Sequence, residues 1–227
     1  MFRALLSAAR ERTAPYSALE ARAYDRLIAP SGMRVILPSV TPFLQALPAT
    51  THLLDVGCGG AHLLAHIATE HPAFHLQGID LSPDQVTLAR ERTAPFTGRV
   101  DIQRASALQL PFPDATFDAA LSIASIKHWP DWHQGLREIV RVLRPGAPFF
   151  VLEADRGCTL EQARHFAALL GFPPPLRRAL LPLFRTFVLG IGWEIDEVRN
   201  LAAKLPLSSK RVTRLEELPM IVLEGTK

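Results

Sequence analysis

The pattern of hydrophobic and polar positions along the chain changes at about residue 51. Beyond that point, short and nearly continuous apolar runs alternate with longer stretches in which apolar residues recur at helical spacing. The apolar runs predict strands at residues 52–57, 74–80, 100–105, 117–124 and 148–154. The stretches between them predict helices at residues 61–70, 82–93 and 131–143. Such alternation is typical of a parallel sheet that is covered by helices on both faces.

The helix predicted after residue 81 carries three signals at its start. Ser82 can accept a hydrogen bond as the N-cap, and Pro83 suits the first helical position. Gln85 stands where the second half of a capping box would be. Together these residues predict where the helix begins.

The two ends of the chain follow other patterns. Residues 1–47 are helical in patches, with one apolar face made by Leu19, Ala23, Leu27 and Ile28. The run Pro-Ser-Gly at residues 30–32 predicts a break in this region. After Asp155 the pattern predicts helices at residues 159–170, 176–189 and 193–205. Two further strands, at residues 210–215 and 220–223, are joined by so short a link that an antiparallel hairpin is expected.

Composition and charge narrow the kind of protein. A chain of 227 residues with 48% hydrophobic and 21% charged residues suits one globular α/β domain. Its 25 basic and 22 acidic residues are interleaved, whereas a nucleic-acid partner calls for a concentrated basic stripe, so none is expected. The excess of arginine over lysine is typical of a GC-rich bacterial genome.

A cytoplasmic location is expected. The two cysteines, Cys58 and Cys158, do not make a disulfide framework. Arg3, Arg10 and Arg12 interrupt the first apolar residues too early for a signal-peptide core. Because no apolar run is long enough to cross a bilayer, no stable membrane insertion is expected. The sequence leaves the oligomeric state open.

The strongest chemical signal is the run Asp-Val-Gly-Cys-Gly-Gly-Ala at residues 55–61, which follows the first strand and opens the first helix. Gly57 and Gly59 allow a sharp turn and a close approach of the backbone to a ligand. Asp80 ends the second predicted strand, where an acid can accept hydrogen bonds from both ribose hydroxyls of a nucleoside. Ser106 and Ala124 also stand at strand ends, so four loops are expected to meet in one crevice.

The residues around these glycines favour one kind of nucleoside. A dinucleotide fingerprint needs a small third residue, but His62 stands there. Asp55 would repel a pyrophosphate, whereas it suits a cationic α-amino group. The pattern therefore favours an amino-acid-bearing nucleoside over NAD.

On these residues the chain resembles the class I S-adenosylmethionine-dependent methyltransferases. It is similar to the branch with the methyltransferase type 11 domain, which includes the ubiquinone-pathway C-methyltransferases and many small-molecule methyltransferases. The matching stretches lie within about residues 50–155, at 53–61, 78–82, 110–118, 126–131 and 136–146.

The resemblance implies a fold and a domain organisation. The fold would be a Rossmann-like, doubly wound α/β sheet of seven strands, mostly parallel with a C-terminal antiparallel hairpin, flanked by helices and carrying a helical cap. A single domain would span residues 1–227, with a helical cap at 1–47 and a cofactor-binding core at 50–155. A helical insertion at 156–207 would form a lid or pocket wall, and the hairpin would occupy 208–227.

The resemblance also implies which residues contact the cofactor, S-adenosylmethionine. Its methionine end would lie against Asp55, Gly57, Cys58 and Gly59. Its ribose and adenine would lie against Asp80, Leu81, Ser106 and Ala107, and its sulfonium near Ile123. Many members carry Asp where this chain has Ser106, and a serine hydroxyl is a weaker acceptor, so a reduced affinity is expected.

The expected reaction is in-line methyl transfer to a small, fairly apolar acceptor through oxygen, nitrogen or carbon, with S-adenosylhomocysteine as the product. His128 is the candidate general base, and stacking in the His-Trp-Pro turn is its structural alternative. The pocket walls would be apolar through Phe166, Phe172, Phe184, Phe187 and Trp193, unless these side chains only pack on the sheet.

Other functions are less well supported. His62 and His66 have the spacing of a zinc-binding pair, but no third ligand is evident and no metal site is predicted. An NAD-dependent oxidoreductase is disfavoured by His62 and by the lack of an evident Tyr-x-x-x-Lys pair. A non-catalytic binding module of the same fold is supported only by Ser106.

Overall fold

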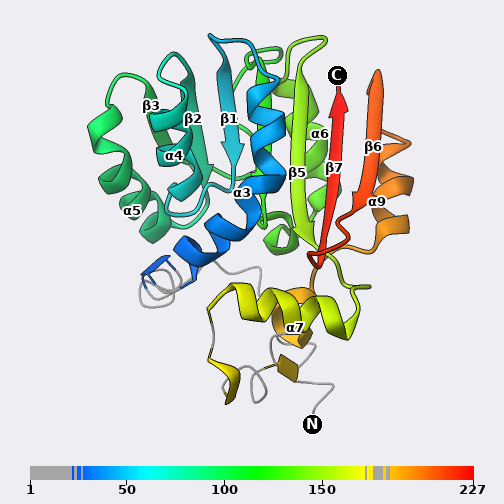
Figure 1. Cartoon of the computed structure of the whole chain (residues 1–227). Coiled ribbons are helices and arrows are strands. Elements are labelled where there is room, and N and C mark those ends of the chain that lie inside the picture. Colours follow the sequence, from blue (N-terminus) through cyan, green and yellow to red (C-terminus); the bar gives the residue numbers. More distant parts are fainter. Residues whose placement is uncertain (1–21, 23–24, 27, 172, 176–180, 183–184) are drawn as a thin grey trace.

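The centre of the molecule is a seven-stranded sheet (Figure 1). The computed structural model describes most of the 227-residue chain, namely residues 22, 25–26, 28–171, 173–175, 181–182 and 185–227. The strands in chain order are β1 (His52–Val56), β2 (His75–Asp80), β3 (Val100–Arg104), β4 (Ala119–Ile123), β5 (Pro148–Ala154), β6 (Ser209–Arg214) and β7 (Met220–Thr226).

The order of the strands across the sheet is β3-β2-β1-β4-β5-β7-β6. The first five are parallel, and β7 runs antiparallel between β5 and β6. The predicted doubly wound, mostly parallel sheet with a C-terminal antiparallel hairpin is thus confirmed. The direction of winding reverses between β1 and β4, which is where open α/β sheets bind ligands.

Helices cover both faces of the sheet because each apolar strand presents alternate side chains to opposite sides. Leu53 of β1 lies in one core cluster with α3 (Ala29–Gln45), α4 (His62–Glu70) and α5 (Pro83–Thr93). Leu54 lies in a second cluster with α6 (Trp132–Val142) and α9 (Ile195–Ala202). Shorter elements complete the chain: η1 (Ala94–Phe96), η2 (Ile126–His128), α7 (Leu160–Leu169) and the π-helix η3 (Arg185–Leu189).

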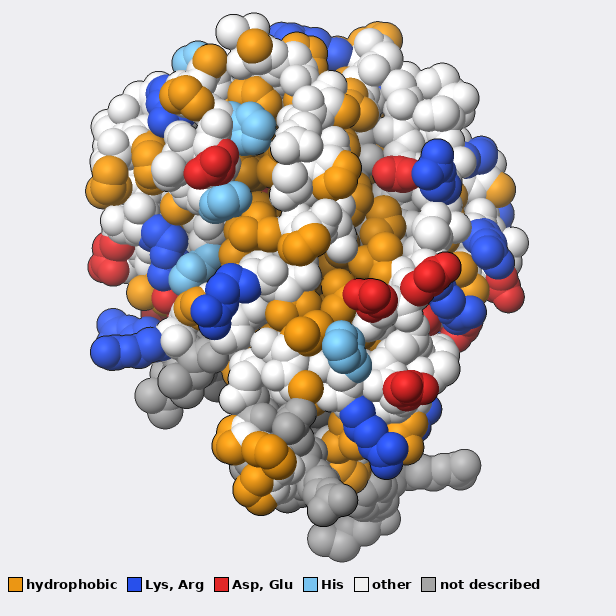
Figure 2. Space-filling model, viewed as in Figure 1, with side chains coloured by type: hydrophobic (Ala, Val, Ile, Leu, Met, Phe, Trp, Pro, Cys, Tyr) orange, Lys and Arg blue, Asp and Glu red, His pale blue; other side chains and the backbone are white. Residues whose placement is uncertain are grey.

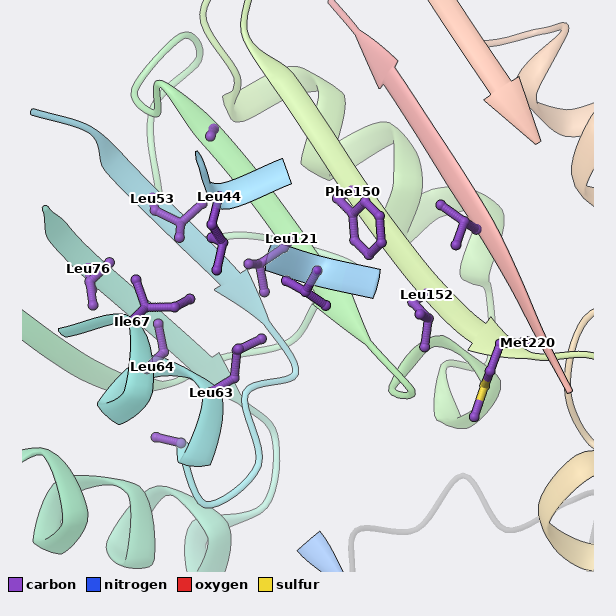
Figure 3. Packing of buried hydrophobic residues seen from close by; sticks show 14 of the residues in the cluster. Leu44, Leu53, Leu63, Leu64, Ile67, Leu76, Leu121, Phe150, Leu152 and Met220 are labelled. Atoms are coloured by element: carbon purple, nitrogen blue, oxygen red, sulfur yellow. The ribbon is translucent and has the colours of Figure 1, made fainter. Parts of the chain in front are cut away.

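The first core cluster shows why these strands and helices pack together. Leu44 of α3 and Leu64 and Ile67 of α4 lie against apolar side chains of the strands (Figure 3). Leu53, Leu64, Ile67 and Leu121 are fully buried. Burying one such side chain contributes about 1.5–3 kcal/mol, so this packing holds the strand ends in register beneath the ligand loops.

The segment between β5 and the hairpin includes α7. The N-cap of α7, Thr159, accepts a hydrogen bond from the N–H of Gln162, whose side chain in turn accepts from the N–H of Thr159. Phe166 of α7 is buried in the first cluster with Leu152 and Met220. Figure 1 shows α7 beyond the carboxyl ends of the parallel strands.

The predicted helix break at residues 30–32 is wrong, because α3 runs through it. Pro30 stands in the first turn, where a backbone N–H has no partner within the helix. The N–H of Gly32 donates to the carbonyl of Ile28 at 2.9 Å, as in a regular helix. Proline and glycine therefore mark the beginning of this helix rather than an interruption.

The predicted capping box on α5 is only half formed. The Ser82 hydroxyl accepts from the N–H of Gln85 at 3.4 Å, and Pro83 begins the helix as expected. The Gln85 side chain does not complete the box, and its buried Oε1 has no hydrogen-bond partner among the described residues.

Some predictions fall on residues outside the described ones. These are the apolar positions Leu19, Ala23 and Leu27, the pocket residues Phe172 and Phe184, and most of the helix expected at 176–189. In the described part of the chain, no helix combines the length and apolarity that a membrane span requires.

Candidate cofactor site

A tight loop at residues 57–61 joins β1 to α4. Gly57 and Gly59 have φ angles of +81° and +53°, in the left-handed region that glycine adopts without steric strain. A Cβ atom on Gly57 would lie 1.8 Å from Ser125 Oγ, so glycine is needed for the loop after β4 to approach. A Cβ atom on Gly59 would meet nothing closer than Gln85 Oε1, at 3.8 Å. The loop is therefore tightly packed at Gly57 and has room beside Gly59.

Asp80 fastens this loop to the end of β2. Its Oδ2 accepts from the N–H of Gly59 at 3.0 Å, and its Oδ1 accepts from the N–H of Ser82 at 2.9 Å. Burial raises the pKa of Asp80, and these two hydrogen bonds oppose that rise. Because each carboxylate oxygen has two lone pairs, Asp80 can hold the loop and still accept hydrogen bonds from a ligand.

Asp55 of β1 is a buried acid without compensation. Only 3% of the residue is exposed, and no hydrogen bond or ion pair reaches its carboxylate from the described residues. Burial, and secondly the charge of Asp80, raise the pKa of Asp55 to about 8. Burial of Cys58, and secondly the charges of Asp55 and Asp80, raise the pKa of its thiol. This corner of the sheet would be stabilised by a cation.

Gln85 adds an unsatisfied acceptor close to the same loop. Its Oε1 is buried, lies near Gly59, and has no hydrogen-bond partner in the part of the chain that the structure describes. A buried polar atom left without a partner costs about 1–3 kcal/mol, which a donor on a ligand would offset. Sequence reasoning placed Gln85 in a capping box and missed this position.

The loop after β3 adjoins Asp80. The N–H of Ala105 donates to the Asp80 carbonyl at 3.1 Å. Ser106 is half-buried, and its hydroxyl already accepts from the N–H of Leu108 at 3.2 Å. Ala107 is buried, whereas Leu81 is 45% exposed. The predicted adenine-side residues therefore lie next to the predicted ribose residue, and Ser106 has limited remaining acceptor capacity.

The loop after β4 brings Ile123 to the same edge. Ile123 is half-buried at the end of β4, and Ala124 follows with a φ of +52°. Ser125 approaches Gly57 and accepts from Trp129 Nε1 at 3.1 Å. Thus the loops after β1, β2, β3 and β4 meet, as the sequence predicts.

A buried ion pair ties the loop after β4 to β5. Lys127 Nζ lies 3.1 Å from Glu153 Oε1 and donates to the Ala124 carbonyl at 2.8 Å. The backbone N–H of Lys127 donates to Glu153 Oε2 at 3.0 Å. Glu153 is fully buried. It is the single acidic residue of the otherwise apolar strand β5, and this signal in the sequence was left unused.

His128 ends the short helix η2 in this loop. Burial is the main cause that lowers its pKa to about 4, and the adjacent Lys127 lowers it further, while Glu153 opposes the shift. The imidazole is therefore neutral at neutral pH. It can accept a hydrogen bond or a proton, but it is a weak base.

The histidines with zinc-like spacing have another arrangement. His62 Nε2 lies 3.0 Å from Asp25 Oδ1, and His66 is half-buried on the same helix. Within the described residues, no group of three or more His, Cys, Asp or Glu side chains is placed to hold a metal ion.

Comparisons with known proteins agree with this geometry. A family described as a methyltransferase domain matches residues 54–151. An O-methyltransferase of Aspergillus nomiae, rstn1, is 39% identical over 127 residues, which cover 54% of this chain and 56% of the relative. The ubiquinone/menaquinone biosynthesis C-methyltransferase UbiE of Geobacter sulfurreducens is 36% identical over 104 residues, which cover 44% of this chain and 41% of the relative.

A solved structure extends the likeness to nearly the whole chain. The SAM-dependent methyltransferase from Aquifex aeolicus superimposes with a TM-score of 0.62 at 16% identity, over 93% of this chain and 99% of that one. Residues 54–151 match a methyltransferase domain, and nearly the whole chain has the fold of that solved methyltransferase. The predicted resemblance to the methyltransferases is therefore confirmed, and this chain spans about half the length of the curated relatives named above.

The methyltransferase domain fits the cofactor that its sequence predicts. The uncompensated carboxylate of Asp55 suits a cationic α-amino group. The open side of Gly59, the free acceptor capacity of Asp80 and the unpartnered Gln85 Oε1 suit a nucleoside with hydroxyl donors. A pyrophosphate would meet the two acids Asp55 and Asp80 at this edge, and both would repel it.

Proposed function

We propose that this chain transfers a methyl group from S-adenosylmethionine to a small, fairly apolar acceptor, releasing S-adenosylhomocysteine. The observation that carries the proposal is the buried and uncompensated Asp55 beside the glycine loop that Asp80 fastens. The relatives named above include an O-methyltransferase and a C-methyltransferase, so the acceptor atom is left open.

The cofactor-binding residues follow from their places at the carboxyl edge. Asp55, Gly57, Cys58 and Gly59 would hold the methionine end. Asp80 and Gln85 would accept from the ribose, with Leu81, Ser106 and Ala107 on the adenine side and Ile123 near the sulfonium. Because the Ser106 hydroxyl already accepts from Leu108, we expect it to hold the adenine amino group only weakly.

S-adenosylmethionine, when bound, supplies an electrophilic methyl group on a leaving group that is already activated. The chain's own residues then have to align the acceptor and exclude water. Orientation of this kind can contribute roughly 7–11 kcal/mol to lowering a barrier. Since His128 is a weak base, the rate enhancement is assigned mainly to orientation.

The walls of the acceptor pocket are assigned to residues 156–207 together with the N-terminal cap at residues 1–47. Phe166 anchors α7 to the core, while Leu160 and Leu169 of this helix are 40% and 43% exposed. Figure 2 shows apolar side chains along the middle of the viewed side of the molecule and on its lower part, where acidic and basic side chains also lie. Trp193 instead packs against Trp132 in the second core cluster, so we exclude it from the wall.

A cytoplasmic location of this proposed enzyme is supported by Cys58 and Cys158, both of which are free. A bacterial source rests on the arginine-rich composition alone, and the Aspergillus relative shows that similar domains also occur in fungi.

The test is calorimetric titration of the purified protein with S-adenosylhomocysteine, with NAD as the competing ligand. We expect S-adenosylhomocysteine to bind and Asp80→Asn to weaken that binding strongly. Glu91→Gln is the matched control, because Glu91 is an exposed acid on the neighbouring helix α5. Binding of NAD alone would contradict the proposal and favour an oxidoreductase.

A second measurement separates an enzyme from a binding module. Protein that binds S-adenosylhomocysteine is incubated with S-adenosylmethionine and a panel of small phenols, amines and quinols. Acceptor-dependent formation of S-adenosylhomocysteine supports the proposal. Binding without turnover of any acceptor would favour the non-catalytic module.

A further inference from the structure

Asp25 connects the segment before α3 to two helices that flank the glycine loop. Its Oδ2 accepts from Arg92 Nη2 at 2.7 Å, and its Oδ1 accepts from Arg92 Nη1 at 3.0 Å. Oδ1 also lies 3.0 Å from His62 Nε2. Arg92 belongs to α5 and His62 is the first residue of α4, so one carboxylate joins three separate parts of the chain.

The same cluster holds the backbone of the glycine loop. Arg92 Nη1 also donates to the carbonyl oxygen of Gly60. A Cβ atom on Gly60 would lie 2.0 Å from Asp25 Oδ1 and 2.7 Å from Arg92 Nη1. Only glycine therefore lets the carboxylate and the guanidinium come this close to the loop.

These contacts are partly shielded from water. Asp25 is 8% exposed, and the side chains of the Asp25–Arg92 pair are 11% and 25% exposed. Burial by itself would raise the pKa of Asp25, but Arg92 and His62 hold it below its ordinary value. A two-pronged, charge-assisted and partly buried contact is stronger than a surface ion pair.

The position of the cluster links it to the ligand loop. Gly60 directly follows Gly59, whose N–H binds Asp80, so Arg92 and Asp80 hold adjacent residues of the loop from two directions. We propose that Asp25 is a positioning residue whose ion pair with Arg92 seats the segment before α3 against the glycine loop and thereby couples that seating to binding of the nucleoside. The identity of the nucleoside rests on the proposed function.

Coupling of this kind is reciprocal. If the seated segment favours the loop conformation that binds S-adenosylhomocysteine, then S-adenosylhomocysteine must favour the seated segment by the same factor. Two readouts therefore report on one interaction: affinity for the nucleoside, and the accessibility of the chain at Arg22 and Arg26, which are both exposed.

The first experiment is a double-mutant cycle on S-adenosylhomocysteine affinity with Asp25→Asn and Arg92→Gln. Each single variant should raise Kd about fivefold to tenfold, and the double variant should be no weaker than either single one. Asp25→Glu, which keeps the charge, should recover part of the affinity. Glu91→Gln, next to Arg92 and exposed, is the control that should leave Kd unchanged.

The second experiment is limited tryptic cleavage after Arg22 and Arg26, with and without S-adenosylhomocysteine. Arg92→Gln should speed this cleavage even though it leaves the sequence around both sites intact, and the nucleoside should slow it in the wild type. Thermal unfolding shows whether each variant is folded before it is scored.

The two proposals fail differently. If wild-type protein does not bind S-adenosylhomocysteine, the proposed function fails, while faster cleavage of Arg92→Gln still supports seating of the segment by Asp25. If folded single variants keep Kd within about twofold of wild type, or if the nucleoside leaves cleavage unchanged, the coupling is overturned.

Discussion

Two buried acids near the carboxyl edge of the sheet, Asp55 on β1 and Glu153 on β5, are in opposite electrostatic situations. Glu153 is fully buried but accepts from Lys127 Nζ at 3.1 Å and from the N–H groups of Lys127 and Ala154. Asp55 is also buried, with 3% of the residue exposed, and no described residue offers its carboxylate a cation or a hydrogen bond.

The difference separates a structural acid from a binding acid. The charge of Glu153 is compensated within the chain, and it holds the loop after β4 against β5. The charge of Asp55 has to be compensated from outside, so the ligand-free protein carries a destabilising group at this point. Natural proteins keep such groups mainly at functional sites. The following predictions test this contrast.

The largest effect is expected for Glu153→Gln. It leaves the Lys127 ammonium buried without its anionic partner, so the free energy of unfolding should fall by about 3–5 kcal/mol. Urea denaturation measures it. The double variant Lys127→Met/Glu153→Gln should recover much of the loss, because no buried charge then remains. A loss below about 1 kcal/mol would show that the pair is not needed for stability.

Asp55→Asn should have the reverse effect on stability. Removing an uncompensated buried acid should raise the free energy of unfolding of the ligand-free protein by about 1–3 kcal/mol. The same change should weaken S-adenosylhomocysteine binding about 100-fold, because it removes the partner of the α-amino group. Urea denaturation checks the gain in stability, and calorimetry checks the loss of affinity. A variant that is less stable than wild type and binds S-adenosylhomocysteine normally would contradict both expectations.

The raised pKa of Asp55 predicts a pH dependence. Between its unfolded pKa of 3.8 and its folded pKa of about 8, the ligand-free folded state holds more protons than the unfolded state. The contribution of Asp55 to stability therefore falls as the pH rises through this window. Pairing with an ammonium favours the ionised form, so ligand binding should release a proton below about pH 8, and affinity should rise with pH up to that value.

Calorimetry in two buffers of different ionisation enthalpy measures the released proton. We expect nearly one proton per ligand at about pH 6.5, and a smaller number as the pH approaches about 8. The matched control is measured without ligand. Between about pH 5 and about pH 8, the free energy of unfolding of the wild type should fall relative to that of Asp55→Asn, which lacks the titrating acid. Binding without proton release at the lower pH would show that Asp55 is ionised in the free protein.

Local patterns account for what the sequence predicts well. The apolar strands, the glycine loop and Asp80 are recognisable because each depends on neighbours within a few residues. The meeting of the four loops follows from parallel strands, whose carboxyl ends share one edge.

The residues that sequence reasoning misses depend on distant partners. Asp25 meets Arg92 across 67 positions, and Lys127 meets Glu153 across 26, through the pairing of β4 with β5. Gln85 has a plausible local role in a capping box, and only the packing around it shows that its Oε1 is unsatisfied. The predicted helix break at residues 30–32 is wrong for a related reason, because proline is found at the beginning of helices as well as after their ends.

His128 gives the smallest expected effect and the finest test of the contrast. It lies next to Lys127, which is paired with Glu153. Burial, and secondly the charge of Lys127, lower the pKa of His128 to about 4. A general base works best when its pKa is near the working pH, and such a base contributes about 10²–10⁴-fold. We therefore expect His128→Gln to lower kcat by less than about tenfold, and the wild-type profile of kcat against pH to lack an ascending limb near the ordinary histidine pKa of about 6.5. Steady-state kinetics from about pH 5 to about pH 9 decide the matter. A loss of about 100-fold or more in kcat at unchanged KM would make His128 the base, and its pKa would then have to rise when the acceptor binds.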